Sequence, residues 1–195
     1  MQRAIDPSRP QPRSSVPVPG FMSVELLIVL AVTGVLLSLA LPSLGAMTDA
    51  QRVRSASSLL LSDLHLVRSE AIKRNGRVAL CKSFDARQCT TVGGWEQGWL
   101  VFHDQNNNGQ VDAGEGIVQQ RAGALSGVRL RGNSPVASYV SYTASGVPRL
   151  VSGAFQAGTL TVCPQSPDAT ATVRRIIIGA PGRPRVVPGL ATDCV

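Results

Sequence analysis

Two arginines near the end of the chain have the type and spacing to bind a polyanion. They lie in the stretch Gly182-Arg183-Pro184-Arg185. Proline restricts its own φ and pushes the preceding residue toward extended backbone, so both guanidiniums are expected on one side, about 6.6 Å apart. Each can bind a phosphate through two hydrogen bonds. The alternative is a solvated basic loop that aids solubility or docks on acidic neighbours.

Positive charge is concentrated in the half of the sequence that contains this stretch. Residues 116–195 hold eight arginines and two acids, a net charge of +6, whereas residues 21–115 hold eight bases and nine acids. Arg174 and Arg175 add to the same basic region. A polyanion bound by such arginines is expected to be held without sequence preference and with a strong dependence on salt.

A second candidate site is a run of oxygen-bearing side chains with calcium-loop spacing. Its members follow the pattern D-x-N-x-N-G-x-x-D-x-x-E, and they are Asp104, Asn106, Asn108, Asp112 and Glu115. Calcium takes six to eight oxygen ligands, and this spacing offers them from one compact loop. The flanking residues look like strands rather than helices, and Asn-Gly is itself a hairpin turn signal. Calcium binding and a polar turn held by side-chain hydrogen bonds therefore remain alternatives.

Four cysteines, without a C-x-x-C pair, indicate two disulfides in an oxidising compartment rather than a zinc site. Three pairings are conceivable. We favour Cys81–Cys89, which closes a short loop, together with Cys163–Cys194, which joins the C-terminal tail to a late strand. The histidines His65 and His103 have no recognisable Ser/Cys–His arrangement, and phosphate loops are absent from the sequence, so we expect no enzymatic activity.

A long apolar run must position the exported part of the chain. Residues 26–48 carry no charge, and the stretch Leu26–Leu41 is almost continuously apolar. We predict a transmembrane helix over residues 21–48, because a signal peptide's apolar region is shorter and ends at a small-residue cleavage site. Three arginines precede it against one acid, which predicts a cytoplasmic N-terminus and an exported C-terminal domain.

The remaining segments predict an α+β architecture. Residues 1–20 have five prolines and no hydrophobic periodicity, which is typical of a disordered segment. Residues 49–75 continue the helix with an apolar stripe at three- and four-residue steps, ending at Asn75-Gly76. Residues 76–195 contain about seven short strand-like runs, which indicate an antiparallel sheet arrangement packed on the helix.

The junction Gly20-Phe21, with the apolar run and Glu25 behind it, resembles the N-terminal signature of type IV pilins and pseudopilins. The resemblance implies that a prepilin peptidase cleaves after Gly20 and methylates Phe21, with residues 1–20 as the leader. It also implies that Glu25 pairs with the N-terminus of a neighbouring subunit during filament assembly. The alternative for Glu25 is a carboxylate favoured by the dipole at a helix N-terminus. Pro19 stands where the family usually has lysine or arginine.

The block Trp95–Val118 is similar to the central part of the FimT/GspH group of minor pilins and pseudopilins. The stretch at Arg183 and Arg185 also resembles the Gly-Arg-x-Arg motif of FimT proteins, which bind DNA during natural transformation. These resemblances imply a minor pilin of a type IV pilus that contacts DNA, in the inner membrane or in the filament. The alternative is a GspH-like structural pseudopilin of the type II secretion system.

Overall fold

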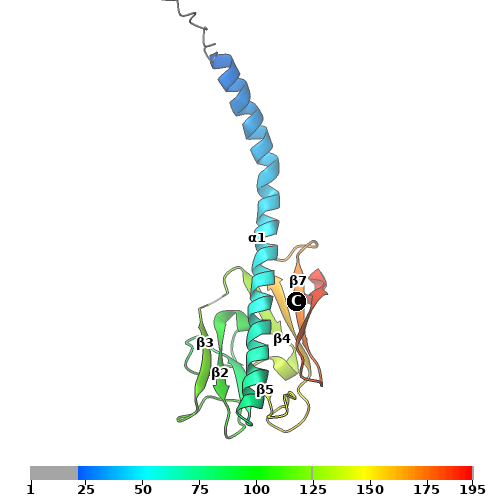
Figure 1. Ribbon diagram of the computed structural model, residues 1–195. Coiled ribbons are helices and arrows are strands. Elements are labelled where there is room, and N and C mark those ends of the chain that lie inside the picture. Colours follow the sequence, from blue (N-terminus) through cyan, green and yellow to red (C-terminus); the bar gives the residue numbers. More distant parts are fainter. Residues whose placement is uncertain (1–21, 124, 195) are drawn as a thin grey trace, which may run out of the picture. The chain divides into compact units, whose positions relative to one another are not determined.

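The computed structural model describes residues 22–123 and 125–194, apart from the side chains of residues 37–44. The chain divides into two compact units, Met1–Pro42 and Ser43–Val195. One helix, α1 (Ser23–Lys73), contributes to both units. The described strands all belong to the second unit (Figure 1).

In the first unit, α1 begins with the backbone amides of Glu25 and Leu26 donating to the carbonyl of Met22. The apolar side chains that follow, from Leu26 to Leu36, are exposed. Within the described residues, no helix combines the length and the apolar character that a membrane crossing requires. The predicted span over residues 21–48 includes residue 21 and the side chains of residues 37–44, which lie outside the described part.

In the second unit, α1 buries one apolar stripe. The stripe consists of Val53, Ala56, Leu60, Leu64, Val67 and Ala71, which are all at most 3% exposed. The helix then stops at Asn75, which adopts a left-handed backbone with φ of 49°. The amide of Gly76 donates to Ala71 O and that of Asn75 to Ile72 O, the two bonds of a Schellman cap. The Asn-Gly pair thus ends the helix as its chemistry predicts.

In the described part of the chain, eight strands form two antiparallel four-stranded sheets. Sheet A has the order β3-β2-β1-β5 and consists of β1 (Val78–Lys82), β2 (Gly98–His103), β3 (Ile117–Ala122) and β5 (Tyr139–Tyr142). Sheet B has the order β4-β6-β7-β8 and consists of β4 (Val128–Gly132), β6 (Gly158–Pro164), β7 (Val173–Ile178) and β8 (Arg185–Gly189). The α+β prediction is confirmed. The sequence predicted about seven strands in one sheet arrangement, whereas the structure has two sheets and includes β8, which was not predicted.

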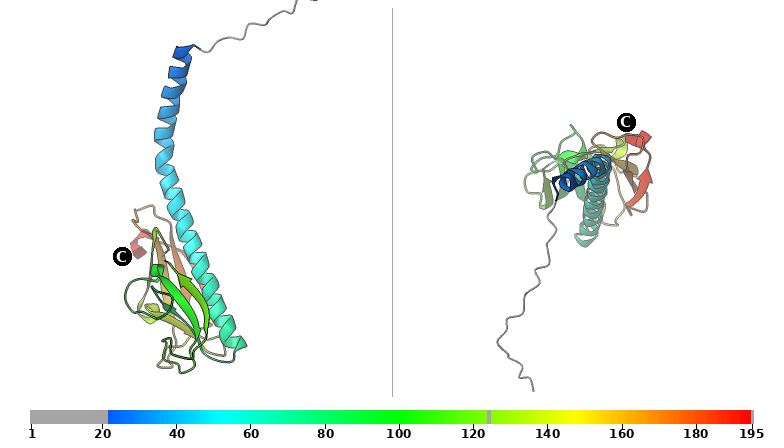
Figure 2. Two further views of the ribbon diagram at one scale, coloured as in Figure 1. Left: turned by 90° about the vertical axis from the view of Figure 1, so that its left-hand side faces the viewer. Right: turned by 90° about the horizontal axis from the view of Figure 1, so that it is seen from above.

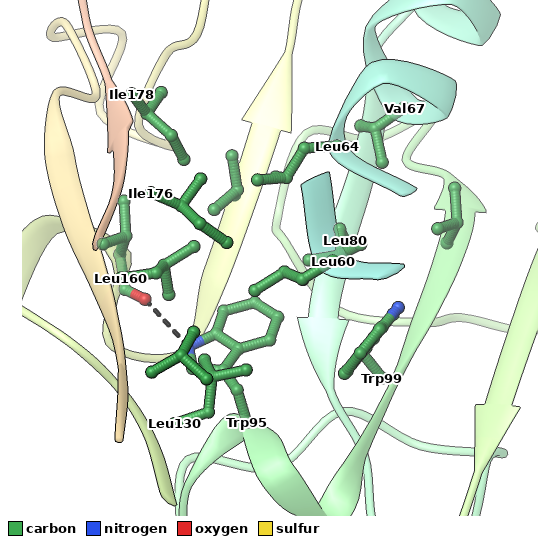
Figure 3. Packing of buried hydrophobic residues seen from close by; sticks show 14 of the residues in the cluster. Leu60, Leu64, Val67, Leu80, Trp95, Trp99, Leu130, Leu160, Ile176 and Ile178 are labelled. Atoms are coloured by element: carbon green, nitrogen blue, oxygen red, sulfur yellow. Dashed lines mark hydrogen bonds between the residues drawn. The ribbon is translucent and has the colours of Figure 1, made fainter. Parts of the chain in front are cut away.

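Both sheets share one core with the helix. In Figure 1, β2 and β3 lie on one side of α1 and β4 and β7 on the other, and in Figure 2 both sheets pack on the same side of the helix. Figure 3 shows the Trp95 indole between Leu60 and Leu80 on one side and Leu130 on the other. Trp95 begins the short 3-10 helix η1 (Trp95–Gln97), and its Nε1 donates to Val136 O at 3.1 Å. The indole therefore fills the space between the sheets with its polar atom satisfied.

A buried carboxylate also joins α1 to sheet A. Asp63 is 2% exposed. Its Oδ2 accepts from Trp99 Nε1 at 2.7 Å and from Arg121 Nε at 2.9 Å, and its Oδ1 accepts from Arg121 Nη2 at 3.2 Å. The carboxylate holds β2 and β3 against the helix by charge-assisted hydrogen bonds, and these hydrogen bonds raise the pKa of Arg121.

The cysteines form the favoured pairs. Cys81–Cys89 closes the segment that follows β1, with Cα atoms 5.6 Å apart, and Cys163–Cys194 joins β6 to the 3-10 helix η3 (Ala191–Cys194), with Cα atoms 5.9 Å apart. The described chain has no free cysteine. The second bond fixes the tail on sheet B.

Candidate functional sites

The β7–β8 hairpin presents Arg183 and Arg185. Its turn closes through the amide of Gly182 donating to Gly179 O at 2.9 Å. Gly182 has φ of +75°, and a Cβ there would lie only 2.1 Å from the carbonyl oxygen of Gly146. A side chain is thus excluded by both backbone conformation and space, so this glycine sets the path of the chain into the arginines.

The two arginines alternate with a buried proline. Pro184 is buried whereas Arg183 and Arg185 are exposed, so both arginine side chains leave the surface on the side away from the proline. Over the described residues, neither side chain makes a hydrogen bond or an ion pair. Both guanidiniums therefore keep their donors available for an external anion.

The strand register separates the other two predicted arginines. Arg174 pairs with Val162 on one side and with Pro188 on the other. It lies on the inner face of the sheet, the face that also carries the core residues Leu160 and Ile176. Arg175, one residue on, lies in a row between Thr161 and Val187 on the opposite, outer face. The sequence treated them as one basic pair, but adjacent residues in a strand point to opposite faces.

Two arginines that the sequence analysis missed lie on that outer face. Arg131 on β4 is the partner of Thr161, so Arg131, Thr161 and Arg175 form one cross-strand row. Arg129 lies two residues before it, beside Cys163. Their signal was the alternation V-R-L-R at 128–131, where Val128 and Leu130 are core residues and the arginines face outward.

The C-terminal helix η3 covers part of the same face. Arg175 Nε lies 3.6 Å from Asp193 Oδ2, and Arg129 Nη2 donates to Cys194 O at 3.1 Å. A cavity of about 180 Å³ remains beside η3, and its lining consists of Arg129, Arg131, Thr161, Cys163, Asp193 and Cys194. The tail thus contributes one carboxylate to a face that otherwise presents arginines.

The acidic loop between β2 and β3 is held by hydrogen bonds among its own members. Asp104 is fully buried, and its two carboxylate oxygens accept from the amides of Asn108 and Gly109. Asp112 Oδ2 accepts from the side-chain amides of Asn106 and Asn108, at 2.7 and 2.6 Å.

The loop is closed by Glu115, whose Oε1 accepts from the amide of Gln105 and whose Oε2 accepts from that of Asp112. Burial raises the pKa of Asp104, whereas hydrogen bonds from Asn106 and Asn108 lower the pKa of Asp112. Among the described residues, no group of three or more acidic, histidine or cysteine side chains is placed to hold a metal ion. The hydrogen bonds of the polar-turn alternative are all present.

At the N-terminal end, Glu25 lies in the first turn of α1 and is exposed. A carboxylate there is favoured by the helix dipole. Gly20 and Phe21, the predicted cleavage and methylation sites, lie outside the described residues.

Comparison with known proteins identifies the chain. The sequence profile described as type II transport protein GspH matches residues 56–182, well over half of the chain. The chain belongs to the GspH family. This GspH-family chain is also 33% identical over 175 residues to the pilin-like protein PilA1 of Thermus thermophilus, covering 86% of this chain and 97% of PilA1.

A solved minor pilin structure shares the fold of the GspH-family chain. The type IV minor pilin FimU of Pseudomonas aeruginosa superposes with a TM-score of 0.52 at 19% identity, covering 75% of this chain and 94% of FimU. The minor pseudopilin EpsH of Vibrio cholerae gives a TM-score of 0.45 at 14% identity, covering 70% and 97%. The GspH-family chain is a pilin-like or pseudopilin-like subunit, which is a structural and non-enzymatic component.

Proposed function

We propose that this GspH-family chain is a minor pilin of a type IV pilus that contacts DNA through the β7–β8 hairpin. The observation that carries the proposal is the pair Arg183 and Arg185, exposed on either side of buried Pro184 and without an intramolecular partner in the described chain. The constrained Gly182 fixes the backbone that carries both arginines, so binding has less backbone to order. The guanidinium fork matches phosphate oxygens and can bind them through two hydrogen bonds.

Binding through these arginines is sequence-independent. The hairpin offers guanidiniums to the phosphate backbone, and phosphate contacts carry no base information. Each neutralised phosphate releases counterions, so the logarithm of the affinity falls by about 0.9 per decade of salt for each contact on duplex DNA. A minor pilin that takes up DNA of any sequence needs this kind of contact.

The test uses the full chain in mild detergent and a labelled 30-base-pair duplex. We expect Arg183→Ala/Arg185→Ala to weaken binding at low salt by on the order of tenfold or more and to reduce the salt slope by about 2. The matched control is Arg54→Ala/Arg87→Ala, which removes the same charge from two exposed arginines outside sheet B. Equal affinity of the hairpin variant and the control would remove the proposed role of the hairpin.

The proposal includes anchoring and assembly through the N-terminal segment. Residues 1–20 act as a leader that prepilin peptidase removes after Gly20, and Phe21 becomes the methylated N-terminus. Residues 21–48 span the inner membrane once, with the N-terminus cytoplasmic and residues 49–195 periplasmic. Glu25 pairs with the N-terminus of a neighbouring pilin as the subunit enters the filament. Support comes from the uncharged run of residues 26–48 and the preceding arginines.

The second candidate is a pseudopilin of the type II secretion system. The matching family profile, described as a type II transport protein, favours it. A deletion strain distinguishes the two candidates: loss of DNA uptake with normal protein secretion supports the pilus, and the reverse result supports secretion. Complementation with the Arg183→Ala/Arg185→Ala variant then separates the hairpin from the remainder of the subunit.

A further inference from the structure

The outer face of sheet B carries arginines from three of its four strands. Arg131 on β4 and Arg175 on β7 both pair with Thr161, so they lie on one face of the sheet. Arg175 also pairs with Val187 on β8, and Arg185 lies two residues before Val187, so Arg185 is on the same face. Arg129 extends the set along β4. The sheet therefore continues the basic surface of the hairpin toward its opposite edge.

We propose that this face is a phosphate-binding track that extends the DNA contact from the hairpin across sheet B to β4. The proposal rests on the proposed function of the hairpin and adds Arg129, Arg131 and Arg175 as positions that bind the backbone. Three strand spacings separate β4 from β8, about 14 Å. A duplex carries roughly one charge per 1.7 Å of axis, so phosphates are available along the whole width of the track.

The surroundings of the track favour an anion. The cavity of about 180 Å³ beside η3 has Arg129, Arg131 and Thr161 in its lining, and the threonine hydroxyl is a further type of donor to a phosphate oxygen. The acidic groups that face these arginines are Asp193, 3.6 Å from Arg175, and Glu96, 3.9 Å from Arg131. Arg131 keeps 58% of its side chain exposed. Such long, partly exposed ion pairs contribute little, so a phosphate can replace the carboxylate as partner of Arg131.

The test compares salt slopes of the full chain in detergent with a 30-base-pair duplex. We expect Arg129→Ala/Arg131→Ala to reduce the slope by about 2 and to weaken binding by on the order of tenfold. Arg54→Ala/Arg87→Ala again serves as the charge-matched control. A slope equal to that of the control, with the hairpin variant still impaired, overturns the track and leaves the hairpin contact intact.

A second variant tests the track without changing Arg129, because Arg129 also donates to Cys194 O and its replacement could disturb the fold. Thr161→Glu places a carboxylate in the row between Arg131 and Arg175, and we expect it to weaken DNA binding more than Gln88→Glu, which adds the same charge in the loop after β1. Equal effects of the two glutamates contradict the track. Absence of DNA binding by the unmodified chain overturns both the track and the proposed function.

Discussion

At the scale of single residues, Asp63 is a buried charged group whose removal should destabilise the fold. It is buried on α1 and accepts three hydrogen bonds, from Trp99 and from Arg121. Without the carboxylate, the Trp99 indole N–H loses its partner in the core, while the guanidinium of Arg121, 38% exposed, can still turn to water. The main penalty is therefore the unsatisfied buried donor together with the lost charged hydrogen bonds.

We expect Asp63→Ala to lower the free energy of unfolding by about 2–4 kcal/mol, measured by urea denaturation. Asp49→Ala is the matched control, because Asp49 pairs with Arg52 on the solvent side of the same helix, with both side chains about half exposed. Exposed pairs of this kind contribute at most about 1 kcal/mol. Equal losses in the two variants would contradict the assigned role of Asp63.

Tyr142 gives the fold a dependence on alkaline pH. Its hydroxyl is buried and has no hydrogen-bond partner among the described residues, and burial raises its pKa above the usual value of 10. Because the folded state favours the neutral phenol, the contribution of Tyr142 to the free energy of unfolding is fully present below pH 10. It is lost as pH rises beyond that value, where the unfolded chain ionises first.

The Tyr142→Phe variant should therefore flatten the fall in stability above pH 10. At pH 7 we expect its free energy of unfolding to equal or exceed that of the unmodified chain by up to about 1 kcal/mol, because the removed hydroxyl was unsatisfied. Unfolding in urea at pH 7 and pH 10.5 measures both effects. Tyr139→Phe is the control, since Tyr139 Oη accepts from the amide of Val151 and its loss should destabilise.

Residues on a regular pattern could be predicted, whereas long-range partners could not. The stripe from Val53 to Ala71 repeats at helical spacing, and each of its members is buried as that spacing implies. The partners of Asp63 lie 36 and 58 residues away along the chain. Local sequence patterns do not predict which strand side chains bind the Asp63 carboxylate, because these contacts depend on the packing of the whole domain.

At the scale of elements, calcium binding and a polar turn remain the two alternatives for the loop from Asp104 to Glu115. Its oxygens are already engaged by amides of the same loop, so calcium would have to displace or share those bonds. For a dissociation constant in the range of extracellular calcium modules, 10 mM Ca²⁺ should stabilise the fold by about 1.4–2.7 kcal/mol. The melting temperature should then rise by about 3–10 °C.

Asp104→Ala and Asp112→Asn should each remove this shift. Asp85→Ala is the control, because Asp85 accepts amide hydrogens in a loop outside the motif. Since burial raises the pKa of Asp104, protons compete with calcium there, and the rise in melting temperature should shrink as the pH is lowered. A melting temperature that is the same in calcium and in chelator would leave the turn without a metal.

Among the elements, strand β8 and the shared face of the arginines could not be predicted from sequence patterns. The run Arg185–Gly189 contains Pro188, and proline normally argues against a strand. It is tolerated here because β8 is the edge of sheet B, where a missing N–H need not break a ladder. Arg129 and Arg131 alternate visibly with core residues, but only the strand order places β4 in the same sheet as β7 and β8.

At the scale of the whole molecule, the proposed anchor predicts a defined mature chain. Mass spectrometry of the protein from membranes should show a chain that begins at methylated Phe21 and lacks residues 1–20. Glu25→Ala should leave cleavage intact but reduce the amount of subunit recovered in sheared filaments, because the carboxylate no longer neutralises a neighbouring N-terminus. A mature protein that retains residues 1–20 would contradict the leader assignment.

The bond Cys163–Cys194 makes β7, the hairpin and β8 parts of one covalent ring with a sequence separation of 31. Arg185, exposed beside the turn, offers trypsin a cleavage site within that ring. A cut there opens the ring without releasing a fragment, so the nicked protein should migrate as one species under non-reducing conditions and as two after reduction. A periplasmic protease that cut there would thus leave residues 186–195 attached to the remainder of the chain through Cys194.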